Sequence, residues 1–464
     1  MTPDRSRPRA THYDLVVIGA GAGGLVTSGG AAQLGARVLL IEQHRLGGEC
    51  LWTGCVPSKA VIHAAQLARN GGGQRWAEAR ANLDQAITTI EPHDSPERFE
   101  DFGVEVVIGR ASFTGPDAIE IGGQRVTARR FVIATGSDPA IPPINGLGEL
   151  PFFTNDTIFD LDEQPEHLLI IGGGVIGCEL SQSFARLGSL VTLISNSALL
   201  PREDPEAVAV VRAQLIADGV TIIENAEVAS AGGEPGAIRL TLADGRTAEG
   251  SHLLIGTGRA PRITGYGLEA AGVETGKGGI VTDAWLRTSN KRIYAIGDCR
   301  DGPRLTHAAD QDARTVIQNA LFPFRKRKDY SALPAAVFTD PELAQVGLTE
   351  PAARALHSDI KVFRQDFDHN DRSVTEADMR GFVKIIVLGK RVLGVTIVGA
   401  HAGELLALAS FAVSGKLGLS DLANQTFAYP TLAEALRQAA EQPGQAALFS
   451  PFMRKLTALF QRLP

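Results

Sequence analysis

Cysteine, aromatic residues and long apolar runs are scarce in this sequence. It has 4 cysteines in 464 residues, and 6% of its residues are aromatic. Four thiols are too few for a disulfide scaffold of the kind that stabilises small secreted proteins. Apolar runs such as residues 168–171 fall far short of the roughly 20 residues that a membrane-spanning helix needs. We therefore expect no membrane span.

Basic residues are in the minority as well. Lys and Arg number 45 against 52 Asp and Glu, so the net charge of -7 gives no electrostatic reason to expect nucleic-acid binding. The one basic run, residues 325–328, is interpreted as a solvated connector. The first 14 residues lack the apolar region of about 7 to 15 residues found in a secretory signal. We expect a cytoplasmic enzyme, with two to four domains because the chain is about three times as long as a typical domain.

Residues 13–43 have the pattern of a dinucleotide-binding unit: a buried strand, a glycine turn, a helix, and a second strand that ends in an acid. Gly19 permits the tight turn, and Gly21 lets backbone N–H groups approach a pyrophosphate at the helix N-terminus. Gly24 permits close packing of the helix on the strand. Glu42, at the end of the second strand, is placed to accept hydrogen bonds from a ribose diol.

The same pattern recurs in residues 167–195, so we expect two bound dinucleotides. This second strand ends at Ser195 and Asn196 rather than at a carboxylate, and an NAD ribose therefore loses its usual acceptor. No arginine replaces the acid to hold the 2′-phosphate of NADP. The sequence leaves the choice between NADH and NADPH open. The three glycines of the repeat are Gly172, Gly174 and Gly177.

Further strands follow the two glycine units. Residues 129–139 and 250–262 are paired strand segments that each lead into a Thr-Gly step, and residues 290–299 form another strand that ends in Asp298. A carboxylate there lies at the edge where α/β sheets bind ligands, so it could bond the polyol of a flavin. The alternative is that Asp298 caps the next turn.

From about Ala335 the composition changes to alternating apolar and polar residues followed by helices, which predicts an α+β domain without a nucleotide fingerprint. Residues 452–463 form a short basic amphipathic helix. A partner or a membrane surface could bind such a helix, but packing on its own domain is the favoured interpretation.

Two of the cysteines, Cys50 and Cys55, lie five positions apart in GGECLWTGCVPSK, residues 47–59. A close pair indicates redox chemistry or a metal. No second CxxC or HxxxH accompanies it, so we expect no zinc site. In an ideal helix the two Cα atoms would lie about 7.5 Å apart along the axis, more than the roughly 6.8 Å that a disulfide tolerates. A bonded pair therefore needs a distorted backbone, which Gly54 permits.

Together these motifs resemble the pyridine nucleotide-disulfide oxidoreductases, a family that includes dihydrolipoamide dehydrogenase, glutathione reductase and mercuric reductase. The resemblance covers essentially the whole chain and rests on the cysteine motif, both glycine fingerprints, and the ATG, GTGR, AIGD and YPTLAEAL segments. It implies an α/β fold with two Rossmann-like dinucleotide-binding domains, a C-terminal α+β dimerisation domain, and a homodimer. The expected bounds are 1–152 and 280–328 for the FAD domain, 153–279 for the NAD(P) domain and 329–464 for the dimerisation domain.

The resemblance also implies roles for particular residues. FAD would occupy the first site and NADH or NADPH the second, with Cys55 against the flavin and Cys50 facing the substrate. Lys59 and Glu179 would pair near flavin N5. The implied FAD contacts are Gly19, Gly21, Gly24, Glu42, Gly48, Lys59, Ala111, Thr135, Gly136, Asp298 and Thr306. The implied NAD(P) contacts are Gly172, Gly174, Gly177, Ser195, Asn196, Val228 and Gly258.

One position departs from this pattern. Tyr429, in the segment TFAYPTLAEAL, stands where the reductases of disulfides and lipoamide carry a histidine base from the partner subunit, whereas the orienting Glu434 is retained. A tyrosine, with a pKa of roughly 10, stays neutral at pH 7 but can still donate a hydrogen bond. The departure disfavours lipoamide and glutathione disulfide as substrates and favours the mercuric-reductase-like branch. Because the sequence has no cysteine after Cys299, we expect no relay of mercury from a C-terminal cysteine pair.

The sequence thus predicts an FAD-dependent NAD(P)H oxidoreductase that passes electrons through a Cys50–Cys55 disulfide to a small acceptor, namely a metal ion, a disulfide or another oxidised sulfur compound. Three alternatives stay open: a flavin diaphorase or quinone reductase that does not use the disulfide, a dihydrolipoamide dehydrogenase-type activity, and a redox sensor that holds FAD structurally.

Several other residues are expected to have ordinary structural roles. Trp52 is expected to pack against the core or to shield the disulfide. The remaining residues of this kind are Cys178, Cys299, His63, His307 and the acidic segment 366–372.

Overall fold

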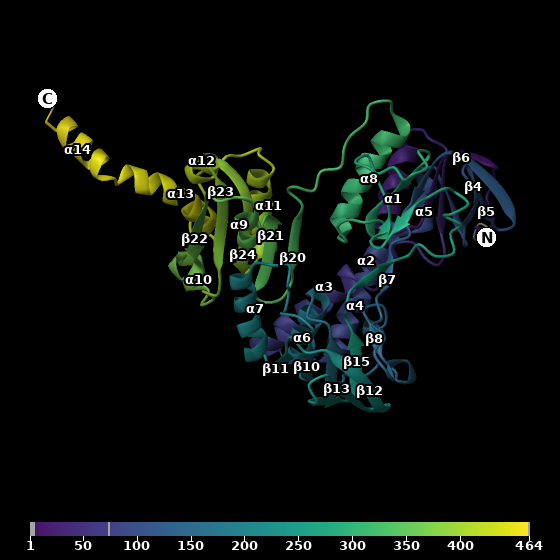
Figure 1. Ribbon diagram of the computed structural model, residues 1–464, viewed down its shortest axis with the longest axis horizontal. Coiled ribbons are helices and arrows are strands. Elements are labelled where there is room, and N and C mark those ends of the chain that lie inside the picture. Colours follow the sequence, from purple (N-terminus) through teal and green to yellow (C-terminus); the bar gives the residue numbers. More distant parts are fainter. Residues whose placement is uncertain (1–4, 73–74, 463–464) are drawn as a thin grey trace. The chain divides into compact units, whose positions relative to one another are not determined.

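The computed structural model describes residues 5–72 and 75–462, which form two compact units (Figure 1). The first unit lies within residues 1–196 and 222–329, and the second within residues 197–221 and 330–464. The sequence places residues 197–221 in the NAD(P)-binding domain instead. These residues join the second unit because helix α7, Pro205–Ala217, packs on two strands of its sheet. The expected domain bounds stay a prediction.

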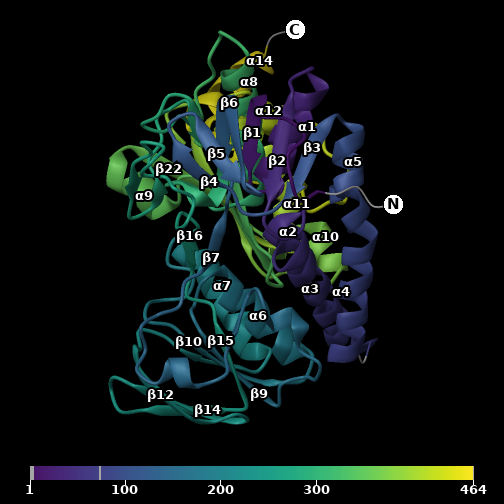
Figure 2. The same ribbon diagram turned by 90° about the vertical axis from the view of Figure 1, so that its right-hand side faces the viewer.

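A seven-stranded sheet forms the first core of the first unit (Figure 2). The strands follow the order β3-β2-β1-β6-β5-β4, with β19 also paired to β6. Leu15 and Val17 of β1 pack with helices α1 and α8 on one face, while Val16 and Ile18 point to the other. The strands are β1 His12–Ile18, β2 Val38–Glu42, β3 Val104–Ile108, β4 Ser112–Gly115, β5 Ala118–Ile121, β6 Gln124–Ile133 and β19 Ile293–Ala295. The two helices are α1 Ala22–Gln33 and α8 Thr306–Leu321.

A second, five-stranded parallel sheet in the same unit repeats this plan. Its order is β11-β10-β9-β15-β8, with helix α6, Val175–Arg186, packed on β9 and β10. A three-stranded antiparallel sheet supplies apolar side chains to the same core. The strands of the two sheets are β8 Phe153–Thr154, β9 His167–Ile171, β10 Leu190–Ile194, β11 Val220–Ile223, β15 His252–Ile255, and β12 Val228–Glu234, β13 Ala237–Leu242 and β14 Thr247–Gly250.

A run of helices after β2 carries the cysteine motif. Helix α3, Cys55–Leu67, packs on both α4 and α6, and Trp76 at the start of α4 stacks on Phe184 of α6 with ring centroids 5.1 Å apart. The other elements of this run are α2 Gly48–Trp52, η1 Ala68–Gly72, α4 Trp76–Ile90, η2 Glu91–Asp94 and α5 Pro96–Asp101. The remaining short elements of the unit are β7 Ser137–Pro139, η3 Leu147–Glu149, η4 Ile158–Asp160, β16 Arg259–Pro261, β17 Thr275–Gly276, β18 Gly279–Ile280 and η5 Gly297–Cys299.

The second unit is built on an antiparallel sheet in the order β20-β21-β24-β23-β22. Its strands are β20 Pro334–Val337, β21 Glu342–Gly347, β22 Ile360–Asp366, β23 Phe382–Leu388 and β24 Arg391–Gly399. Its further helices are α9 Glu350–Leu356, η6 Phe367–His369, α10 Asp371–Thr375, α11 Ala402–Val413, α12 Leu419–Asn424, α13 Glu434–Leu448 and α14 Pro451–Phe460.

Both faces of this second sheet are covered. Val383 and Ile385 of β23 pack with α11 and α13. On the alternate face Ile386 packs on Ala353 of α9, and Lys384 forms an ion pair of 3.0 Å with Asp204 at the start of α7. The alternation of apolar and polar residues is therefore present, but the polar face is buried too.

The C-terminal helix α14 does not pack in this way, because none of its residues is buried. The favoured interpretation, packing on its own domain, is therefore wrong for residues 452–460; Leu463 lies outside the described residues. Among the residues that the structure describes, no helix has both the length and the hydropathy for a membrane span.

Candidate active site

The two cysteines of the motif lie on either side of a break between helices. Helix α2 ends at Trp52, and α3 begins at Cys55. Gly54 between them has φ -124° and ψ -109°, and a Cβ added there would lie 3.0 Å from the Glu49 carbonyl oxygen. The backbone distortion that a Cys50–Cys55 bond would need is therefore present at Gly54.

The two thiols have opposite acidities. Cys50 and Cys55 are free thiols. The interaction between their side chains is the main reason why the pKa of Cys55 is lowered to about 6 and why the pKa of Cys50 is raised. Thr306, whose Oγ1 lies 3.3 Å from the Cys55 sulfur, also contributes to the lowered pKa of Cys55. Cys55 is thus the more acidic of the two thiols.

An ion pair stands beside the thiolate. Lys59 Nζ, one turn after Cys55 on α3, lies 3.0 Å from Glu179 Oε2 on α6. The side chain of Glu179 is 4% exposed and that of Lys59 is 37% exposed. The positive charge of Lys59 also contributes to the lowered pKa of Cys55. The pairing of Lys59 with Glu179 that the resemblance implies is present.

The first glycine turn has the geometry of a pyrophosphate cradle. Gly19 has φ +104°, and a Cβ there would lie 2.3 Å from the Ala134 carbonyl oxygen; a Cβ at Gly24 would lie 1.8 Å from the Gly19 carbonyl oxygen. At Gly21, by contrast, the nearest atom to an added Cβ would be 3.9 Å away. Glu42 Oε2 accepts a hydrogen bond of 2.8 Å from the Ala20 backbone N–H. This shape fits a dinucleotide, because packing forces glycine at two positions and open space lies over the third.

The second glycine turn repeats these features. An added Cβ would lie 2.3 Å from the Gly256 carbonyl oxygen at Gly172 and 1.8 Å from the Gly172 carbonyl oxygen at Gly177, while Gly174 has open space. Ser195 and Asn196 follow the end of β10, the first buried and the second exposed. The residues of this chain therefore fit a second dinucleotide as well.

The other residues implied for the cofactors lie near these turns in the chain or at strand ends. Thr135 and Gly136 follow β6, and the Thr135 hydroxyl donates to the Arg262 carbonyl oxygen at 2.6 Å. Ala111 is buried before β4. Val228 begins β12, Gly258 precedes β16, and Gly48 begins α2.

A polar network links the cysteine helix to the end of β19. Arg259 Nη2 lies 2.6 Å from Glu49 Oε2, and Arg259 Nε donates to Ser137 Oγ at 2.8 Å. Ser137 Oγ in turn donates to Asp298 Oδ2 at 2.8 Å. Burial is the main reason why the pKa of Glu49 rises to about 7. The sequence prediction missed Glu49 and Arg259; the arginine of the GTGR segment was the one signal that could have pointed to them.

Comparison with known proteins now decides the family. The model of the pyridine nucleotide-disulphide oxidoreductases matches residues 13–313, and the model of their dimerisation domain matches residues 333–440. The chain belongs to the pyridine nucleotide-disulphide oxidoreductase family. The predicted family and fold class are confirmed. The chain is an NAD(P)H-dependent flavoprotein oxidoreductase with FAD and NAD(P)H as its cofactors, and the matched dimerisation domain supports a homodimer.

Relatives of this family cover nearly the whole chain. A mercuric reductase of Streptomyces lividans is 36% identical over 456 residues, which are 93% of this chain and 96% of the relative. A dihydrolipoyl dehydrogenase of Thermus scotoductus is 35% identical over 92% of this chain and 97% of the relative. Among solved structures, the copper(II) complex of the HOCl-induced flavoprotein disulfide reductase RclA from Escherichia coli has a TM-score of 0.87 at 29% identity. That match covers 93% of this chain and 100% of RclA.

Tyr429, the tyrosine at the position of the expected histidine base, lies in the second unit, and the cysteine pair lies in the first. Tyr429 is 71% exposed, and its hydroxyl donates to Asp371 Oδ2 at 2.7 Å. This hydrogen bond is the main reason why the pKa of Tyr429 is raised. Glu434, the expected orienting residue, lies 3.4 Å from Arg437. Asp371 was missed, because the acidic segment 366–372 reads as a solvated turn.

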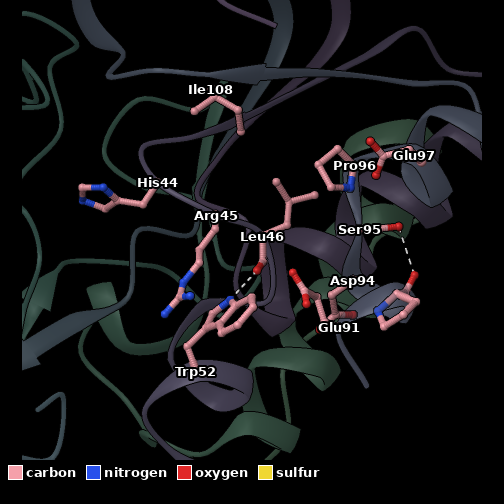
Figure 3. A pocket seen from close by; sticks show the side chains of 11 residues that line it. His44, Arg45, Leu46, Trp52, Glu91, Asp94, Ser95, Pro96, Glu97 and Ile108 are labelled. Carbon is pink, nitrogen blue, oxygen red and sulfur yellow. Dashed lines mark hydrogen bonds between the residues drawn. The ribbon is translucent and has the colours of Figure 1, made fainter. Parts of the chain in front are cut away.

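Trp52 lies at a pocket beside the end of β2 (Figure 3). Its indole N–H donates to the Leu46 carbonyl oxygen at 2.6 Å, and the Arg45 guanidinium lies 3.6 Å from the ring centroid. The interpretation of Trp52 as a packing residue is therefore supported. The pocket is lined by His44, Arg45, Leu46, Trp52, Glu91, Pro92, Asp94, Ser95, Pro96, Glu97 and Ile108.

The remaining cysteines and two further histidines differ from the cysteine pair in burial and acidity. Cys178 and Cys299 are fully buried, and burial raises the pKa of Cys178 to about 12 and that of Cys299 to about 11. His63 on α3 and His307 on α8 are exposed. Within residues 5–72 and 75–462, no group of three or more His, Cys, Asp and Glu side chains could hold a metal ion.

Proposed function

We propose that this family member uses Cys50 and Cys55 to pass an electron pair from NAD(P)H to a small oxidised acceptor, either a thiophilic metal ion or an oxidised sulfur compound such as a disulfide. The observation that carries the proposal is the acidity of the pair: the pKa of Cys55 is lowered to about 6 and that of Cys50 is raised. A pair in which one sulfur is a thiolate and the other keeps a proton is suited to stepwise thiol–disulfide exchange.

FAD supplies, when bound, the chemistry that links a hydride from NAD(P)H to the reduction of a disulfide. We propose that Glu42 and Asp298 hold its ribose and ribitol, and that Lys59 and Glu179 lie at the flavin. The FAD contacts proposed are Gly19, Gly21, Gly24, Glu42, Gly48, Lys59, Ala111, Thr135, Gly136, Asp298 and Thr306. The NAD(P) contacts proposed are Gly172, Gly174, Gly177, Ser195, Asn196, Val228 and Gly258.

With a disulfide acceptor, the proposed exchange has two steps. Cys50 loses its proton and attacks one acceptor sulfur; a mixed disulfide forms, the acceptor's S–S bond breaks, and its other half takes up that proton and leaves as a thiol. The Cys55 thiolate then attacks the Cys50 sulfur, which forms the Cys50–Cys55 disulfide and releases the second acceptor thiolate. Two electrons pass to the acceptor. The lowered pKa of Cys55 keeps it ready for the second attack at neutral pH.

The presence of Tyr429 favours an acceptor whose reduction needs no base at this position. Its pKa is raised by Asp371, so at neutral pH it stays a hydrogen-bond donor and takes up no proton. Mercuric reductases are among the relatives at 33–36% identity, which adds support for a metal ion. We propose that Tyr429 positions the acceptor, and that lipoamide-type disulfides are poor substrates.

The test compares the wild type with the variant Cys50→Ser. Flavin reduction by NADH or NADPH and turnover of mercury(II), copper(II), lipoamide, glutathione disulfide and a quinone are measured anaerobically. We expect flavin reduction to persist and turnover of the metal ion or sulfur acceptor to be lost. Cys178→Ala, which removes a buried thiol outside the motif, is the matched control and should turn over as the wild type does. Full acceptor turnover by Cys50→Ser would contradict the proposal and favour a diaphorase that does not use the disulfide.

A further inference from the structure

The C-terminal helix α14 is the largest feature that the proposed function leaves unused. The first turns of helix α13 pack on the sheet of the second unit through the buried residues Ala435, Leu436 and Ala439. Pro443 lies inside this helix, which continues to Leu448, and Gly444 follows the proline. The match to the family's dimerisation domain ends at residue 440. Residues 444–462 therefore lie beyond the part of the chain that matches this domain.

Residues 444–462 contain sequence features that favour the start of a helix. Ser450 is the N-cap of α14, accepting a hydrogen bond of 3.3 Å from the Met453 backbone N–H, and a proline stands at the first helical position. Both features stabilise a helix start without help from tertiary packing. In Figure 1, α14 lies beyond α13, away from the sheet of its own unit. The segment thus folds as a separate helix although none of its residues is buried.

One stripe of α14 is strongly apolar. Phe452, Leu456, Leu459 and Phe460 recur at the i, i+4, i+7 and i+8 positions that share a helix face. Phe452 is 71% exposed, and Leu459 and Phe460 are each more than half exposed. Phe449, in the turn before the helix, is exposed as well. So many large exposed apolar side chains within twelve residues mark an interaction surface.

The charge of the segment identifies the partner. From residue 442 to residue 464 the sequence has three basic residues, Arg454, Lys455 and Arg462, and no acidic one, whereas the whole chain has a net charge of -7. Arg454 and Lys455 fall outside the apolar stripe. An apolar face flanked only by cations is the pattern of a helix that lies in the interface of an anionic bilayer.

A second copy of the chain is a weaker match for this stripe. The other large exposed apolar side chains among the described residues lie one or two at a time on separate elements, for example Leu34, Ile141, Ile216 and Leu356. We propose that α14 is an interfacial anchor that binds the enzyme reversibly to membranes rich in anionic phospholipid.

The experiment is co-sedimentation of the full-length flavoprotein with vesicles of phosphatidylcholine alone or mixed with phosphatidylglycerol. We expect binding to the mixed vesicles that weakens as salt is raised. Arg454→Glu with Lys455→Glu should lower partitioning by more than about tenfold, because each cation near an anionic surface contributes about 1 kcal/mol. Phe452→Glu with Leu459→Glu should abolish binding.

Leu356→Glu is the matched control, since it places one acid at an exposed apolar position of the same unit but outside α14; its binding should equal that of the wild type. Light scattering of every variant reports the oligomeric state. Wild-type protein that stays in the supernatant with mixed vesicles at low salt would overturn the proposal. So would a Phe452→Glu, Leu459→Glu variant that binds vesicles unchanged or that breaks the homodimer, the result expected if a second copy covers the stripe.

Discussion

The two pairs of cysteines in this chain show how far the surroundings determine the acidity of a thiol. The Cys55 side chain interacts with those of Cys50 and Thr306 and with the Lys59 charge, and its pKa is lowered to about 6. Cys178 is buried in helix α6, and burial raises its pKa to about 12. The charged form of a thiol is favoured by hydrogen bonds and cations and disfavoured by an apolar interior. The reactive thiol is therefore Cys55, which lies at the break between helices α2 and α3 next to Gly54.

The largest expected effect is the contrast in alkylation between these thiols. With its pKa lowered to about 6, Cys55 carries far more thiolate at neutral pH than Cys178, whose pKa is raised by burial to about 12. The rate of iodoacetamide labelling of the reduced enzyme at Cys55 should rise with pH through about 6 and then level off. Peptide mapping by mass spectrometry measures it. Labelling of Cys178 in the folded enzyme at a comparable rate would remove the contrast.

A smaller effect should follow from Lys59→Met. Removing the cation should raise the pKa of Cys55, so the midpoint of its alkylation profile should move to higher pH. The shift should be partial, because the interaction with the Cys50 side chain is the larger cause of the lowered pKa and remains. Lys277→Met, which removes an exposed charge from the turn between β17 and β18, is the control and should leave the midpoint unchanged. An unmoved midpoint in Lys59→Met would show that Lys59 does not support the thiolate.

The parts of the site that lie within one local motif could be predicted from the sequence. The strand, glycine turn and helix around Gly19 and Gly172 form within about thirty residues, and the backbone break at Gly54 lies inside the cysteine motif. Such features follow from local sterics: a glycine that packs against a carbonyl group leaves no room for a Cβ.

Contacts between distant parts of the chain could not be predicted in the same way. Arg259 pairs with Glu49, and Tyr429 pairs with Asp371. The GTGR segment points to Arg259 as a residue of interest, but no pattern in the sequence identifies the partner of either residue. Helix α14 shows the same limit, since its amphipathic pattern predicted the helix but not what its apolar stripe contacts. In β23 Lys384 is buried and pairs with Asp204, a contact between distant residues that the alternating pattern did not predict.

The central claim is that electrons pass through a Cys50–Cys55 disulfide, and a thiol count tests it most directly. The oxidised enzyme and the enzyme reduced anaerobically with NAD(P)H are each denatured in the presence of a thiol reagent. We predict that only Cys178 and Cys299 react before reduction and that all 4 cysteines react after it. Reaction of all 4 cysteines in the oxidised enzyme, with no increase on reduction, would contradict the account.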